Sequence, residues 1–290
     1  MYVWDSTTGR VSFDVGSVPF VGFEAWSVDS AEFVVADCKE IRRYDVACGG
    51  YFGGYAGHVA KQVDHFMVLV RDGKFTPDGT RLLTLGADGT IRAWSVASGR
   101  QIGDAKPDRP GDFLLLAPSG SYAMLVRRKR DENGAWQGTD YRLFDPNTLL
   151  PTGDWQKAPE EWPRGFLGER RAIWDGESGV VAASVDDPRG EALPPEEKSA
   201  HLLAVSAPSE SYVVGLPATS EAAIVRADGQ ITMISAVPAE DGQSVIYDFA
   251  GGGFSPDSSI VYLVHPIAGL AAYDAATGEK RLQFETPANS

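Results

Sequence analysis

Residues 75–100 read FTPDGTRLLTLGADGTIRAWSVASGR, a stretch that contains three turn sequences at short intervals. PDG favours a turn between two strands, ADG readily accommodates positive φ, and the glycine of SG suits a tight reversal. The segments between these turns, RLLTLG and TIRAWSV, are short and rich in residues that suit a pleated surface. We therefore expect consecutive β-strands, with no room between the turns for helices of ordinary length.

The same frame recurs in FSPDSSIVYLVHPIAGLAAYDAATGE, residues 254–279. In both stretches nineteen steps separate the leading phenylalanine from an aromatic residue, and a glycine follows five residues later. A search with this frame recovers weaker copies along the chain. We call the position of the aromatic residue in this frame the closing position of a copy. The closing positions are separated by 40 to 50 residues and are Trp4, Tyr44, Trp94, Phe144, Val185, Val225 and Tyr273. Repeats of this length are typical of the four-stranded blades of β-propellers.

The copies divide the single predicted domain into one partial and six complete repeats. Their approximate bounds are 1–15 (partial), 16–53, 54–103, 104–154, 155–195, 196–237 and 238–290. The sequence thus predicts an all-β fold, a β-propeller of four-stranded antiparallel blades with seven blade positions. Either six blades close and the N-terminal hairpin is an extra flap, or one of seven blades lacks its two inner strands. Because Met1 falls inside a repeat, we expect the chain to begin downstream of the natural domain start.

The sequence resembles the WD-repeat (WD40-type) β-propeller proteins in residues 75–100, in residues 254–279 and in VWDSTTGR at residues 3–10. The resemblance covers nearly the whole chain. It implies that one repeat supplies the three inner strands of a blade and the outer strand of the previous one, and that the two chain ends share a blade. Degenerate repeats and a composition rich in Ala, Gly and Asp are more typical of bacterial than of animal proteins.

The structural network of that family joins a histidine, a serine or threonine, an aspartate and the tryptophan. Asp88 and Trp94 match the last two, and His65 lies near the position of the histidine, although it fits an exposed imidazole as well. Gly86 stands where the hydroxyl residue is expected, which predicts an incomplete network. The Gly57-His58 dipeptide looks like that of the family but lies too far upstream. The aromatic closing positions are expected to lie in the blade cores.

Composition limits the partners. The 290 residues carry a formal net charge of −14, which argues against general nucleic-acid binding because phosphates would be repelled. No window approaches 18 consecutive apolar residues and no signal peptide is visible, so we expect no membrane insertion. Cys38 and Cys48 form no CxxC pair and are interpreted as reduced thiols, with a bridge between neighbouring turns as the alternative. These features predict a cytoplasmic protein.

Catalytic signatures are scarce. The four histidines are dispersed, and the motifs HExxH, GxSxG and GxxxxGK[ST] do not occur. Acidic pairs at residues 160–161, 186–187 and 196–197 lie beside proline and glycine, so we expect them in solvated loops. The oxygen ligands of DDPRGE do not alternate as a calcium loop requires. The sequence therefore predicts no catalytic residue, no metal and no cofactor.

The most distinctive insertion is VRRKRDENGAWQGTDYRLF, residues 126–144, which lengthens the hairpin between the second and third strands of its copy. It is expected to project five side chains beyond the blade, namely Arg127, Arg128, Lys129, Arg130 and Trp136. Arginine and tryptophan are enriched at interaction hot spots, and a cationic finger on an acidic body suits an acidic partner. The alternatives are a solvated hairpin whose tryptophan folds back on its own blade, and a nucleic-acid or nuclear-localisation patch, which the two acids that follow disfavour.

Two classes of function follow. The first is a non-catalytic protein–protein interaction scaffold of the WD-repeat type, which binds a partner through loops on one face of the disc. The second is a propeller enzyme, a lactonase-like hydrolase or a quinone-dependent dehydrogenase, with polar residues around a metal or cofactor at the central channel. Propellers host both classes. The scattered acids and histidines and the projecting hairpin favour the scaffold.

Overall fold

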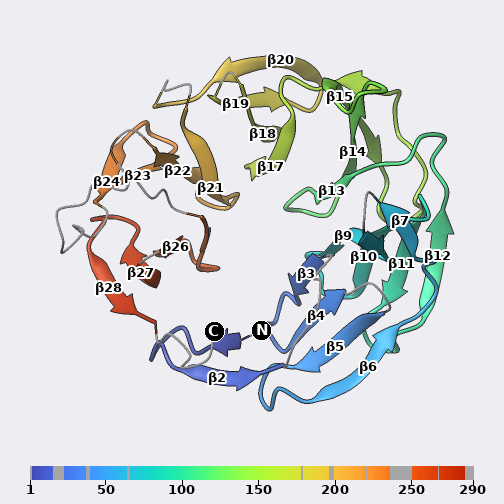
Figure 1. Ribbon diagram of the computed structural model, residues 1–290, viewed down its shortest axis with the longest axis horizontal. Helices are drawn as coiled ribbons and strands as arrows, with labels where there is room; N and C mark the ends of the chain where they lie inside the picture. Colours follow the sequence, from blue (N-terminus) through green and yellow to red (C-terminus); the bar gives the residue numbers. More distant parts are fainter. Residues whose placement is uncertain are drawn as a thin grey trace. The chain divides into compact units, whose positions relative to one another are not determined.

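The computed structural model describes residues 2–15, 23–36, 40–63, 66–177, 179–195, 199–217, 219, 221–235, 250–266 and 268–284. Over these ranges the chain contains strands and turns but no helix, and the strands form six four-stranded antiparallel sheets and two two-stranded sheets (Figure 1). The predicted all-β architecture of four-stranded blades is thus confirmed, and the fold is a six-bladed β-propeller. The partial N-terminal repeat forms one of the two-stranded sheets.

The chain forms two compact units, the first comprising Met1–Val3 and Ser12–Ala158 and the second Trp4–Val11 and Pro159–Ser290. Three four-stranded sheets lie in the first unit. They consist of β3 (Phe23–Trp26), β4 (Glu32–Ala36), β5 (Ile41–Asp45) and β6 (Tyr51–Tyr55); of β9 (Val70–Phe75), β10 (Arg81–Gly86), β11 (Ile91–Ser95) and β12 (Gln101–Ala105); and of β13 (Phe113–Leu116), β14 (Ala123–Arg130), β15 (Trp136–Phe144) and β16 (Gln156–Lys157).

The other three four-stranded sheets lie in the second unit. They consist of β17 (Trp162–Leu167), β18 (Arg171–Gly176), β19 (Gly179–Ser184) and β20 (Asp187–Ala192); of β21 (His201–Ser206), β22 (Ser211–Leu216), β23 (Glu221–Val225) and β24 (Ile231–Ile234); and of β25 (Gly251–Phe254), β26 (Ile260–His265), β27 (Gly269–Asp274) and β28 (Lys280–Gln283). The two-stranded sheets pair β1 (Tyr2–Trp4) with β2 (Val11–Asp14) and β7 (Lys61–Val63) with β8 (Phe66–Val68).

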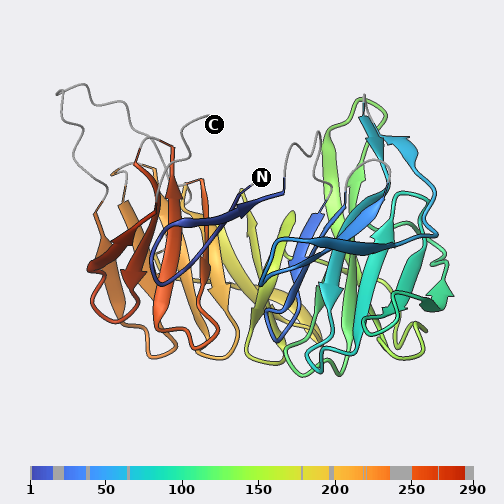
Figure 2. The same cartoon turned by 90° about the horizontal axis from the view of Figure 1, so that it is seen from below.

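Each four-stranded sheet is built from four strands that are consecutive in sequence, and these run side by side between two sets of loops (Figure 2). The expectation that the chain ends share a blade is wrong. The last sheet takes all four strands from residues 251–283, whereas among the described residues β1 and β2 pair with each other and with no other strand. The physical reason is local burial, because Val3 and Phe13 of this hairpin pack against Phe33 and Tyr44 of the first sheet.

The turn sequences form the reversals that the second sheet needs. In the PDG turn Asp78 Oδ1 accepts hydrogen bonds from Thr76 Oγ1 at 2.6 Å and from the Thr80 amide at 3.0 Å, while Gly79 adopts a φ of +69°. The left-handed region is open to glycine at little cost. In the ADG turn the Thr90 amide donates to Asp88 Oδ1 over 3.0 Å. The four strands between residues 70 and 105 therefore follow the pattern that the sequence predicts.

The hydrophobic core lies between neighbouring sheets of the same unit. In the first unit, Tyr55 and Val34 of one sheet pack against Leu82 and Trp94 of the next. In the second unit, clusters of aliphatic and aromatic side chains fill the spaces on both sides of the β21–β24 sheet. Burial of such side chains contributes about 1.5–3 kcal/mol each, so the cohesion of a blade depends on its neighbours.

Arginines also tie adjacent sheets together. The guanidinium of Arg43 on β5 forms a bidentate ion pair with Glu32 on β4, at 2.7 and 2.8 Å, and donates to the carbonyl oxygen of Val96 in the next sheet. In the second unit, Arg226 Nη2 donates to the carbonyl oxygens of Ala275 and Ala276, both at 2.6 Å. Both arginines satisfy carbonyl groups in the turn between the third and fourth strands of the following blade.

Candidate functional site

Four side chains of the first unit, which we call the His58 network (His58, Thr84, Asp88 and Trp94), form a continuous hydrogen-bonded chain. Trp94 Nε1 donates to Thr84 Oγ1 over 2.7 Å, and Thr84 Oγ1 lies 2.7 Å from His58 Nε2. His58 Nδ1 lies 3.4 Å from Asp88 Oδ1. Because the Asp88 carboxylate can only accept, the proton of neutral His58 is on Nδ1, so Nε2 accepts a hydrogen bond from the Thr84 hydroxyl, which accepts from the indole.

This network corrects the expectation of an incomplete one. His65 lies outside the described residues, and His58 occupies the position that the sequence suggested for His65. The hydroxyl comes from Thr84 and not from the position of Gly86. The spacing between His58 and β9 is long because β7 and β8 pair with each other within it. The histidine of the Gly57-His58 dipeptide therefore belongs to this network, although the sequence placed it too far upstream.

Gly86 is the residue that lets the imidazole approach the strand. A Cβ atom at this position would lie 2.2 Å from His58 Nδ1 and 2.3 Å from Asp88 Oδ1. Burial of the ring, and next the positive charge of Arg92, lower the pKa of His58 to about 4. Burial acts to raise the pKa of Asp88, but hydrogen bonds from Thr90 and Val59 outweigh it and lower that pKa to about 2. The imidazole is thus neutral and the carboxylate charged at neutral pH.

All closing positions except Trp4 lie at or beside the end of the third strand of a four-stranded sheet. Tyr44, Trp94, Phe144 and Tyr273 are all buried there, and Trp4 is half-buried in β1. Trp94 is 1% exposed and makes edge contact with the His58 ring. The four buried aromatic side chains are therefore placed as packing elements, away from solvent.

The inserted hairpin is formed by β14 and β15, the second and third strands of their sheet, as the sequence predicts. The guanidinium carbon of Arg128 lies 5.1 Å from the centroid of the Phe113 ring, on the neighbouring strand. Arg130 Nη1 donates to the Gly134 carbonyl oxygen over 2.7 Å, across the hairpin turn. Trp136 is half-buried, and its Nε1 donates to Thr139 Oγ1 over 3.3 Å. Arg127 is half-buried on β14.

Two loops that are distant in sequence reach the base of this hairpin. Arg142 Nη1 on β15 donates to Asp108 Oδ1 over 2.9 Å, and Trp155 Nε1 donates to the same oxygen over 3.2 Å. The hydrogen bond from Trp155 and the charge of Arg142 lower the pKa of Asp108. The guanidinium carbon of Arg109 lies 5.7 Å from the centroid of the Trp155 ring. The sequence gave no sign of the contact between Arg109 and Trp155.

The acidic pairs do not form a common site in the described residues. Asp186 and Arg170 form an exposed ion pair, and Asp187 pairs with Arg189. Glu160, expected in a solvated loop, is instead 7% exposed, because its carboxylate packs over Gly176, which has no side chain. The pair at residues 196–197 lies outside the described residues. Among the residues described, no three His, Cys, Asp or Glu side chains are grouped as metal ligands.

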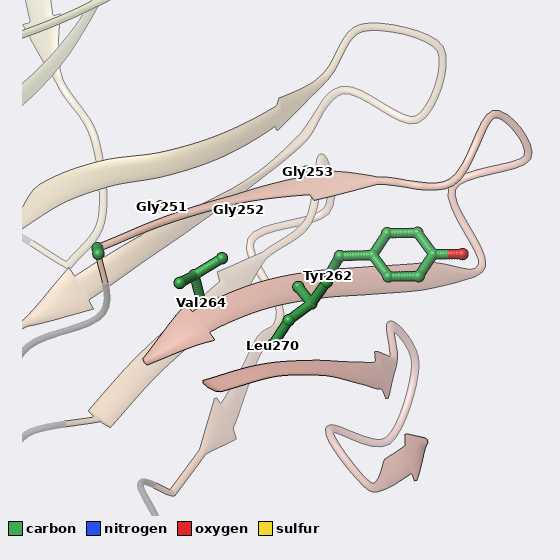
Figure 3. Close-up of a pocket in the computed structure, with 7 residues that line it drawn as sticks. Gly251, Gly252, Gly253, Tyr262, Val264 and Leu270 are labelled. Carbon is green, nitrogen blue, oxygen red and sulfur yellow. The ribbon is translucent and has the colours of Figure 1, made fainter. Parts of the chain in front are cut away.

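A hollow of about 260 Å³ borders strand β25 in the second unit (Figure 3). Its walls are the backbone of Gly251–Gly253 and the side chains of Tyr262, Val264 and Leu270. The glycines pair in regular register with β26, so no bulge accounts for them. A Cβ at Gly252 would lie 2.7 Å from both Leu263 Cδ2 and the Tyr262 carbonyl oxygen, whereas Gly251 and Gly253 face open space.

Two further expectations from the sequence concern the cysteine thiols and membrane insertion. Cys48 is an exposed free thiol, and Cys38 lies outside the described residues. The described residues include no helical segment with the length and hydropathy of a membrane span.

Comparisons with known proteins identify the fold and no family. No family model matches the sequence, and no curated protein matches it. Among solved structures, a chain of the Kuenenia stuttgartiensis hydrazine synthase is similar, with a TM-score of 0.63 and 13% sequence identity. The match covers 90% of this chain and 78% of that one. At this identity the likeness concerns the β-propeller fold alone.

Proposed function

We propose that this chain is a non-catalytic interaction scaffold of the WD-repeat type, which binds an acidic protein partner through the β14–β15 hairpin. The observation that carries the proposal is the length of that hairpin. Strand β13 pairs with β14 only from Ala123 to Val126, whereas β14 and β15 continue for four more pairs, from Arg127–Asp140 to Arg130–Trp136. The added segment contains four consecutive basic residues in a chain of net charge −14.

Electrostatics favours an acidic partner for this segment. An acidic body repels an acidic partner over most of its surface, whereas the basic hairpin attracts it, which orients the encounter. Arg130 is exposed near the turn of the hairpin, and the Trp136 ring on the facing strand is half-buried. Such pairs of arginine and tryptophan are common at the centres of protein interfaces.

The WD-repeat assignment is supported by the His58 network. Its histidine, threonine, aspartate and tryptophan are the residue types that the resemblance implies, and they lie in hydrogen-bonding order. A bacterial origin and the cytoplasmic location stay predictions from the sequence. The hydrazine synthase chain is an enzyme component by its name, and at 13% identity we propose no related activity for this chain.

The test is an affinity capture from lysate of the organism that encodes the chain. Wild-type protein is compared with the double variant Arg130→Ala/Trp136→Ala, which leaves the packing of Arg128 on Phe113 intact. The control is Arg189→Ala, which removes one positive charge from an 89% exposed side chain in the second unit. A captured protein is then identified, purified and titrated against all three baits by calorimetry.

We expect one stoichiometric protein ligand that binds the wild type and the control alike and binds the hairpin variant at least about tenfold more weakly. Equal affinity for all three baits, or recovery of no protein ligand, would refute the proposed function. Circular dichroism of each bait verifies that the sheets are intact.

A further inference from the structure

One buried carboxylate at the base of the hairpin faces three cations. The side chain of Asp140 is 11% exposed; its Oδ1 lies 2.9 Å from Lys129 Nζ and its Oδ2 lies 3.8 Å from Arg109 Nη1. Arg127 is the direct cross-strand partner of Asp140, so the two side chains leave the sheet on the same face. Lys129, two residues further along β14, shares that face. A single negative charge cannot neutralise this group.

A second carboxylate, Asp108, lies near Arg109, whose charge is one of the causes that lower its pKa. Its Oδ1 atom accepts hydrogen bonds from Arg142 and Trp155. The same Trp155 ring lies against the guanidinium of Arg109. A cation held against an aromatic face loses less conformational entropy when it binds an anion. Arg109 is therefore positioned before any ligand arrives.

The cations remain accessible to solvent although Asp140 is not. The side chains of Arg109 and Lys129 are 48% and 36% exposed, against 11% for Asp140. An incoming carboxylate can therefore approach the outer side of both cations while Asp140 stays behind them. Charge-assisted hydrogen bonds of this kind are about twice as strong as neutral ones.

We propose that Arg109, Arg127 and Lys129 form a carboxylate anchor, which binds the acidic side chains of an extended segment of a partner protein. This inference rests on the proposed function and specifies its chemistry. Asp140 limits the affinity of the anchor for a carboxylate, because its own negative charge neutralises one of the three positive charges. The acidic remainder of the chain repels such a segment and so confines it to this face.

The test uses the full chain and a defined probe. The probe is a fluorescein-labelled peptide of alternating Glu and Ser, and its reference is the same peptide with Gln for Glu. Binding is measured by fluorescence anisotropy at low ionic strength, where exposed charges are least screened. The proteins are the wild type, Arg109→Ala/Lys129→Ala, Asp140→Asn, and the control Arg189→Ala.

We expect the wild type to bind the Glu peptide and not the Gln peptide. The double variant should bind about five- to tenfold more weakly, and Asp140→Asn about threefold more tightly, with Arg189→Ala unchanged. The rise in affinity on removing a carboxylate distinguishes an anchor from a purely structural ion pair. Arg109→Ala/Lys129→Ala alters exposed side chains, so it keeps the test valid if Asp140→Asn folds poorly.

Absence of binding by the wild type, an unchanged affinity in the double variant, or weaker binding by a folded Asp140→Asn protein would each overturn the anchor. Failure of the anchor is separable from failure of the proposed function. If the purified partner still binds Arg109→Ala/Lys129→Ala but not Arg130→Ala/Trp136→Ala, the hairpin function stands and the anchor falls. If the peptide results are as expected but no partner protein depends on the hairpin for binding, the anchor stands and the proposed function falls.

Discussion

At the scale of single residues, Gly86 decides whether the His58 network can form. A methyl group at this position would coincide with the imidazole and the Asp88 carboxylate, at 2.2 and 2.3 Å. Because both groups are held by backbone and side-chain hydrogen bonds, neither can move aside without breaking the chain from Trp94 to Asp88. Glycine therefore permits the contact and does not replace a missing hydroxyl.

We predict that Gly86→Ala lowers the free energy of unfolding of the first unit by about 2–4 kcal/mol, since it leaves buried polar groups without partners. The measurement is urea denaturation monitored by tryptophan fluorescence. Gly103→Ala is the matched control on β12, where a Cβ would lie 3.7 Å from Leu149 Cδ1, an ordinary contact. Equal effects of the two substitutions would contradict the assigned role.

Protonation of His58 gives a second prediction at this scale. Its pKa is lowered to about 4 in the folded chain, against about 6.5 when unfolded, so the unfolded state binds more protons between these values. The contribution to stability is fully present above about pH 6.5 and is lost as the pH falls toward 4, by a total of about 3 kcal/mol.

Urea denaturation of the wild type and of His58→Gln across this pH range measures the effect. The variant has no titrating ring, so its stability should depend less steeply on pH, although it is lower at neutral pH. Parallel pH profiles for the two proteins would show that His58 is not the group responsible.

At the scale of the element, the three glycines of β25 have different reasons to be small. Gly252 packs against β26 and cannot accept a Cβ without displacing Leu263 or the Tyr262 carbonyl group. Gly251 and Gly253 face open space, and none of the three has positive φ. Steric need therefore explains only the central glycine of this strand.

We predict that Gly252→Ala destabilises the second unit by about 1–3 kcal/mol through overpacking. Gly253→Ala should leave stability unchanged or raise it by up to about 1 kcal/mol, because alanine restricts the unfolded chain. Thermal unfolding of both variants provides the measurement. A loss from Gly253→Ala as large as that from Gly252→Ala would mean that the open side of β25 is filled in solution.

At the scale of the whole molecule, cohesion depends on contacts between successive blades within each unit. Arg43 and Glu32 are 8% and 7% exposed, and the Tyr55 hydroxyl also donates to Glu32 Oε1, over 3.2 Å. The hydrogen bond with Glu32 is the main cause of the raised pKa of Arg43. Removing one partner of a buried ion pair leaves the other charge uncompensated, which is the costly case.

We therefore predict that Arg43→Met destabilises the first unit by about 3–5 kcal/mol, and that the double variant Glu32→Gln/Arg43→Met recovers at least about half of the loss. Equilibrium denaturation of four proteins, namely the wild type, Glu32→Gln, Arg43→Met and the double variant, forms a double-mutant cycle. If the two substitutions are simply additive, the pair is not coupled and the link to the Val96 carbonyl accounts for the whole effect.

The sequence alone determined the fold class, because turn residues and strand-forming residues are local signals. The turn sequences PDG, ADG and SG within one copy, and the separations of 40 to 50 residues between the closing positions of the copies, were sufficient to predict four-stranded blades. The same local reading located the lengthened β14–β15 hairpin, and it found Asp88 and Trp94 within the His58 network.

Only the tertiary structure decided which distant side chains meet. His58 lies 26 residues from Thr84, beyond an inserted β7–β8 pair that no spacing rule allowed for. Asp108 and Trp155 are 47 residues apart and are brought together by packing of two loops on β15. Loop packing depends on burial and charge in three dimensions, for which a linear pattern carries no signal. The four-stranded blades therefore followed from local conformational preference, whereas the grouping of side chains in the proposed carboxylate anchor depended on the fold.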